Sequence, residues 1–252
     1  MNVAVGGLNV LLGIVYTSYG IMTAVEMKRG WKTLGFSHFG AAWIAMAFTC
    51  GPHHLAHGLH LLVGGGHAGG LDLAYVLIGL PAGAIWFLLR VEAFGGGRGD
   101  RFISGTPRWL ATSPAITIVY GATFVVLATR IASAGGVRLS SMVAPNMLLV
   151  GIYITIGYFL IRTQLRNRDG LGGWSVSGIS LGVVFPTCAV MHAAVAVYGL
   201  SGLYGFDVNG FVIDWLAVPA ALYFLWVVHG LYQDALRDWN RTAQRRPAIL
   251  VG

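Results

Sequence analysis

Seven apolar stretches, each close to the length that crosses a bilayer, follow one another along this 252-residue chain with short polar connections. A helix needs roughly 20 apolar residues to span the hydrocarbon core. By residue number the stretches are 4–25, 38–63, 71–91, 110–132, 142–162, 175–200 and 209–232. Because no polar segment between them is long enough to fold separately, the sequence predicts an all-α, seven-helix bundle embedded in lipid.

The composition favours the same class of protein. Only 10% of the residues are charged and 56% are hydrophobic, whereas soluble proteins carry about 25% charged residues. The net charge of +7 does not indicate nucleic-acid binding, because the basic residues are spread over short connections rather than gathered in one patch. The only lysines, Lys28 and Lys32, follow the first stretch, so no span carries the amine that retinal would need.

The basic residues also predict the orientation in the membrane. If the connection after the first stretch is cytoplasmic, all lysines and arginines fall inside except Arg130 and Arg138. The positive-inside rule then places the N-terminus outside and the C-terminus inside. We expect the chain to reside in the plasma (cytoplasmic) membrane.

An internal repeat is visible when the sequence is compared with itself at the separation of Cys50 and Cys188. The match runs without a gap from Gly35 to Val91, and it aligns His54 with His192. A one-residue shift joins the first and fifth stretches, which places Asn9 and Tyr16 on Asn146 and Tyr153. The predicted segments are a three-helix repeat over 1–94, a basic loop and linker helix over 95–137, and a second three-helix repeat with a basic tail over 138–252.

The two copies are expected to cross the membrane in the same direction, because the offset covers four helices, an even number. Such a parallel repeat has its axis along the membrane normal, so that equivalent residues face one another. This 3+1+3 architecture resembles that of the sugar-efflux (SWEET) and PQ-loop transporters, which are also of similar length. The resemblance implies a transporter-like bundle; no Pro-Gln pair occurs in the chain, and no site residue is carried over.

Each copy contains the pattern Thr-Cys-x-x-x-His, as "TCGPHH" in the second stretch and "TCAVMH" in the sixth. Residues four apart stack on one helix face, so Cys50 lies beside His54 and Cys188 beside His192. In the second stretch, Cys50 and all the histidines from His53 to His60 fall within an arc of about 120°. Ionisable residues inside a membrane indicate a functional site.

Thiolate, imidazole and thioether groups are the donors that suit copper(I), and cysteine with histidine suits zinc equally well. We therefore predict a copper or zinc site between the second and sixth stretches, used for metal uptake or delivery. The candidate ligands are Cys50, His53, His54, His57, Cys188, Met191 and His192.

Four further residues are candidates for orienting the ligands or relaying protons, namely His60, Asp214, His38 and His229. Asp214 is the clearest lone acid within a span, and a carboxylate of this kind can fix the tautomer of a ligating histidine. Asp72 and Asp207 are expected in outer loops, facing water.

Three other functions remain open from the spacing alone. One is transport of a small solute or protons, with the histidines acting as titrating groups. His54 and His192 could bind haem b from opposite sides in a redox protein, alone or within a larger membrane complex. A metal-bound water could instead make the chain a metal-dependent membrane enzyme.

Overall fold

The computed structural model describes residues 1–105, 143–200 and 212–233, with isolated positions between 112 and 129. Within these residues the chain forms six helices and one pair of two-residue strands. The elements are α1 (Asn2–Leu34), α2 (His38–Leu62), α3 (Gly70–Phe94), β1 (Phe102–Ile103), α5 (Val143–Asn167), β2 (Trp174–Ser175), α6 (Val176–Leu200) and α7 (Val212–Tyr232). The predicted linker helix at 110–132 lies largely outside the described residues, so the prediction of seven helices is not supported here.

The helices form a bundle suited to lipid. Five of them in the described part are long and apolar enough to cross a membrane, namely α1, α3, α5, α6 and α7. Helix α2 has the same 25-residue length as α3, but its histidines lower its mean hydropathy. Large apolar side chains such as Ile78 and Leu88 are exposed on the surface, whereas the histidines at the centre of α2 are buried. The chain is therefore an integral membrane protein whose helices contact lipid.

Helix α1 is longer than the apolar stretch from which we predicted it. It continues past residue 25 through a charged segment and ends at Gly35, which has a φ of 75°. Glycine adopts this left-handed conformation without steric cost, which is why it commonly ends helices. In the added turns Glu26 forms an ion pair with Arg90 of α3.

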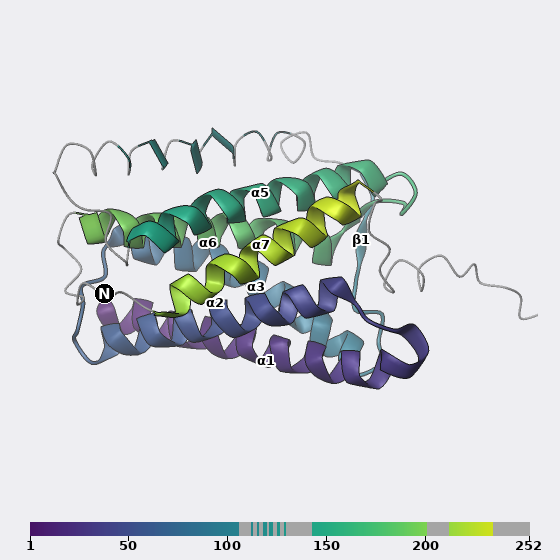
Figure 1. Ribbon diagram of the computed structural model, residues 1–252, viewed down its shortest axis with the longest axis horizontal. Helices are drawn as coiled ribbons and strands as arrows, with labels where there is room; N and C mark the ends of the chain where they lie inside the picture. Colours follow the sequence, from purple (N-terminus) through teal and green to yellow (C-terminus); the bar gives the residue numbers. More distant parts are fainter. Residues whose placement is uncertain are drawn as a thin grey trace, which may run out of the picture.

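The packing of the first three helices has a counterpart in the last three (Figure 1). Helix α1 packs on α2 as α5 packs on α6, and α1 contacts α3 as α5 contacts α7. Between the two groups, α3 packs on α6 and α2 packs on α7. The centre of the bundle is thus formed by α2 and α6 together with α3 and α7.

One end of the bundle, here called the basic end, carries Arg90, Arg98, Arg101, Arg166 and Arg168. Strands β1 and β2 pair there in an antiparallel arrangement, with Phe102 opposite Ser175. The Asp100 carboxylate accepts hydrogen bonds from the hydroxyl groups of Ser175 (2.6 Å) and Ser177 (2.8 Å) and from the Ser177 backbone N–H (3.0 Å). These contacts join the segment after α3 to the start of α6.

An aromatic cluster fills the core between the basic end and the middle of the bundle. Trp43 and Trp86 lie 4.2 Å apart between ring centroids, and Phe185 stacks on Phe224 at 5.1 Å. Trp43 contacts Phe224 as well, at 5.7 Å. The cluster therefore connects α2, α3, α6 and α7 with apolar contacts and separates the polar interior from the basic end.

The close approach of α1 and α2 depends on glycine. A Cβ atom placed on Gly58 would lie 2.6 Å from the carbonyl oxygen of Gly6, whereas one placed on Gly7 would meet nothing within 4 Å. Overpacking of this kind typically costs about 1–3 kcal/mol. We expect Gly58→Ala to lower the unfolding temperature of the purified protein clearly and Gly7→Ala to leave it nearly unchanged. Equal effects of the two substitutions would contradict this account of the α1–α2 contact.

Candidate metal centre

A continuous chain of hydrogen bonds runs through the interior from α2 to α6. His53 Nδ1 lies 2.5 Å from Asp214 Oδ1, and the other oxygen of Asp214 accepts a hydrogen bond from Asn146 Nδ2 at 2.9 Å. The Asn146 carbonyl oxygen in turn lies 2.5 Å from His192 Nδ1. All four side chains are at most 2% exposed. Residues from α2, α7, α5 and α6 are thus joined in one buried polar network.

The position of Asp214 helps to explain how a carboxylate is accommodated in this interior. It lies in the first turn of α7, where the helix dipole favours a negative charge. Its two oxygens both accept hydrogen bonds, as the network shows, and a buried carboxylate without such partners would be strongly destabilising.

His54 has a separate but closely similar environment. Its Nδ1 lies 2.8 Å from the side-chain oxygen of Asn9 in α1, and Asn9 donates its amide to the Val5 carbonyl. The Asn9–His54 pair is therefore arranged like Asn146–His192. Among the described residues, the buried His54 Nε2 has no hydrogen-bond partner.

These contacts determine the tautomers of three histidines. A carboxylate or amide oxygen only accepts hydrogen bonds, so Nδ1 carries the proton in His53, His54 and His192. In the neutral ring, Nε2 then carries the lone pair. Histidines that bind metals in proteins almost always donate their other ring N–H to an oxygen in this way.

His53, His192 and Asp214 each offer one ligand atom, and these three atoms lie within 4.8 Å of one another. The ring centroids of His53 and His192 are 5.0 Å apart, and those of His53 and His54 are 6.0 Å apart. This buried cluster could hold a metal ion after small side-chain movements. In the part of the chain that the structure describes, it is the one such group of His, Cys, Asp and Glu residues.

His57 and His60 continue from this cluster along α2, away from the basic end. The His57 ring stacks at 6.4 Å from that of His53, and its Nε2 lies 3.2 Å from the Tyr75 hydroxyl. His57 is 1% exposed, and His60 is partly exposed near the end of the helix. The histidines of α2 therefore extend from the middle of the bundle to its end.

Asp72 differs from our expectation of a water-facing loop residue. It is 1% exposed and accepts the Gly69 backbone N–H at 2.7 Å, at the start of α3. The Tyr198 hydroxyl of α6 lies beside the same glycine. Asp207, which we also expected in a water-facing loop, lies outside the described residues.

The cysteines lie in a different layer from the histidines. Cys50 and Cys188 are both free thiols, located at the centre of their 25-residue helices. Neither belongs to the group that His53, His192 and Asp214 form. Met191 is buried beside His192 on α6.

Two of the candidate relay residues lie far from the cluster, towards the basic end. His38, the first residue of α2, has its Nδ1 atom 3.1 Å from the hydroxyl of Tyr223 in α7. His229, in the last turn of α7, packs against Phe159 with 4.9 Å between ring centroids. The aromatic cluster separates both residues from Asp214.

Three partners of the histidines were absent from our candidate set, namely Asn9, Asn146 and Tyr75. The two asparagines carried a signal, because the repeat comparison aligns them with each other. Tyr75 carried none, since its contact with His57 depends on how α3 is rotated against α2.

Comparison with protein families, curated proteins and solved structures found no match to this chain.

Asn146 is the residue whose removal should affect the network most. Asn146→Leu leaves both His192 Nδ1 and Asp214 Oδ2 without this partner, and each buried unsatisfied group costs about 1–3 kcal/mol. Asn9→Leu, its matched control in α1, removes the partner of His54 alone. We expect thermal unfolding of the purified protein to show a larger destabilisation for Asn146→Leu than for Asn9→Leu. The reverse order would contradict the described network.

Proposed function

We propose that this protein binds a transition metal ion, copper or zinc, through the buried histidines of α2 and α6 and serves metal uptake or delivery across the membrane. The observation that carries the proposal is the buried cluster of His53, His192 and Asp214. Imidazole nitrogen is a preferred ligand of both metals. The two imidazoles of this cluster, each oriented by an oxygen acceptor, would supply such ligands.

The hydrogen bonds favour particular donor atoms. Two ligands of a tetrahedral ion with bonds of about 2.0–2.2 Å lie more than 3 Å apart, so His53 Nδ1 and Asp214 Oδ1, at 2.5 Å, do not suit one ion. We infer that His53 and His192 bind through Nε2 while Asp214 and Asn146 hold their rings. His54, whose ring is held by Asn9 in the same way, is the third proposed ligand. For all three histidines to bind one ion, the His54 ring must move towards the other two rings.

The gradient of donors along α2 supports a role in moving the ion. His60 and His57 lead from the end of the helix to the cluster, and Met191 adds a buried thioether beside His192. Such a series offers successive imidazole sites, with the softer sulfur donors deeper in the bundle. Binding would release protons from any ligand that was protonated, so affinity should fall in acid.

We also propose the seven-helix, 3+1+3 form of the bundle, with the N-terminus outside and the segments 1–94 and 138–252 as its repeats. The matching packing of α1–α3 and α5–α7 supports this form, as do the paired Asn–His contacts. The gathering of arginines at one end supports a cytoplasmic basic end.

Haem is the runner-up cofactor, and the site favours it less. A haem between His54 and His192 needs an open slot for the macrocycle, whereas the His53 ring packs against both of their rings. A single ion needs no such slot.

Elemental analysis of the purified protein, loaded with zinc and then dialysed, tests the proposal. We expect about one ion per chain bound by the histidine cluster, lost in His53→Ala and in His192→Ala because each removes a ligand. Asp214→Asn should retain the ion but weaken its binding by about 10- to 100-fold, the usual effect of removing an orienting partner.

His67→Ala, which changes an exposed histidine outside the cluster, serves as the matched control and should bind as the unchanged protein does. Retention of zinc in the His53→Ala/His192→Ala double variant would refute the proposed ligands, and iron accompanied by a Soret band would favour haem.

A further inference from the structure

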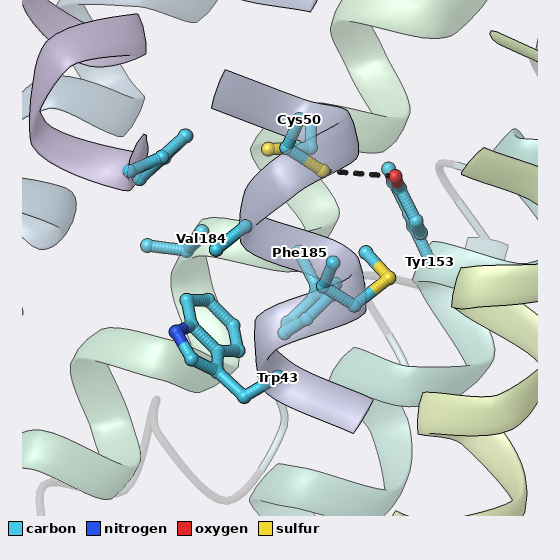
Figure 2. A pocket seen from close by; sticks show the side chains of 9 residues that line it. Trp43, Cys50, Tyr153, Val184 and Phe185 are labelled. Carbon is cyan, nitrogen blue, oxygen red and sulfur yellow. Dashed lines mark hydrogen bonds between the residues drawn. The ribbon is translucent and has the colours of Figure 1, made fainter. Parts of the chain in front are cut away.

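A second group of side chains that can bind a metal surrounds a small cavity. This cavity lies between the aromatic cluster and the histidine cluster, which comprises His53, His192 and Asp214. The cavity, of about 10 Å³, is lined by residues of α1, α2, α5 and α6, among them Met46, Cys50, Cys188, Tyr16 and Tyr153. A cavity of this size offers space on the order of one water molecule. Figure 2 shows Cys50 pointing towards Tyr153 in this cavity, which Trp43 and Phe185 also line.

Each thiol shares the cavity with a tyrosine from the other helix group. Cys50 Sγ lies 3.1 Å from the Tyr153 hydroxyl (Figure 2), and Cys188 lines the cavity together with Tyr16. A tyrosine hydroxyl can donate to a thiolate, so Tyr153 is placed to stabilise the Cys50 sulfur in its anionic form.

The same tyrosines separate the sulfur layer from the histidine layer. The Tyr153 ring lies 5.3 Å from that of His192, and the Tyr16 ring lies 5.4 Å from that of His54, measured between centroids. No histidine is among the residues lining the cavity. The lining instead presents three sulfur atoms, from Cys50, Cys188 and Met46.

The number and kind of donors favour copper(I) over zinc. Structural zinc sites almost always have four ligands, drawn from Cys, His, Asp and Glu, whereas this cavity offers three sulfur donors, one of them a thioether, which copper(I) accepts. Charge supports the same choice, because one thiolate, one thiol and one thioether around a monovalent cation give a neutral complex. A neutral complex avoids the large cost of a net charge in a low-dielectric interior.

We propose that Cys50, Cys188 and Met46 form a second, all-sulfur site that binds one copper(I) ion in the middle of the bundle. Binding replaces the proton of one thiol by Cu⁺ and releases that proton to solvent; no electron is transferred. The site would receive a soft cation from the histidine layer beside it, but its ligands do not depend on the histidine cluster. The proposal deepens the proposed metal transport by naming copper(I) as the cargo that can occupy both layers.

Titration of the reduced, detergent-solubilised full-length protein with copper(I), in competition with a chromophoric copper(I) chelator, tests the sulfur site. We expect the Cys50→Ser/Cys188→Ser double variant to bind one copper(I) fewer per chain than the unchanged protein. Met46→Leu, which nearly conserves volume, should retain both thiols but weaken that copper(I) by about tenfold or more, as loss of a ligand would.

Two controls separate the sulfur site from the histidine site. The His53→Ala/His192→Ala variant should still bind the thiol-dependent copper(I), with sulfur-only coordination in its X-ray absorption spectrum. Zinc binding should be unchanged in the double cysteine variant, which also shows that this variant is folded. Equal copper(I) stoichiometry and affinity with and without the two cysteines, or nitrogen ligands in the spectrum of the histidine variant, would overturn the proposal.

Discussion

The contact between the Asp214 carboxylate and the His53 imidazole is the interaction on which the interior of this bundle depends. A carboxylate buried among apolar helices is tolerated only with charged or hydrogen-bonding partners, and here those partners come from α2 and α5. Satisfying Asp214 therefore fixes the rotation of three helices at once. Because Asn146 passes the constraint on to His192, the fourth central helix, α6, is aligned by the same charge.

The interior combines matching and differing pairs. Asn9–His54 resembles Asn146–His192, and Cys50 and Cys188 line one cavity together with Tyr153 and Tyr16. The two copies of the proposed repeat differ around the Asp214 carboxylate. The first copy has His53 where the second has Met191, and the second copy has Asp214 where the first has Val76. A site on a pseudo-twofold axis would become directional through such differences, since its two sides present unlike ligands to the same ion.

Hydropathy and residue spacing predicted much of this structure, and side-chain partners much less. The apolar stretches predicted the six described helices, because a span's length is set by the bilayer and not by its neighbours. The spacing of Cys50 and His54 placed both on one helix face for a purely local reason. By contrast, the burial of Asp72 depends on the packing of α6 against the start of α3, where Tyr198 lies beside Gly69 and Asp72. Asn9, though aligned with Asn146, did not reveal that it holds a histidine, because that contact depends on the rotation of α1 against α2.

The pairing of β1 with β2, supported by Asp100, limits how the two helix groups can move relative to each other. This clasp joins the segment following α3 to the first turn of α6. If the strand pairing and the Asp100 hydrogen bonds stay intact, the two helix groups can move only about a pivot at the basic end. Such a motion separates the helices most at the opposite end of the bundle. Separation of the two helix groups at the basic end would instead require the Asp100 hydrogen bonds to break, and these join both carboxylate oxygens to two serine hydroxyls and the Ser177 backbone N–H.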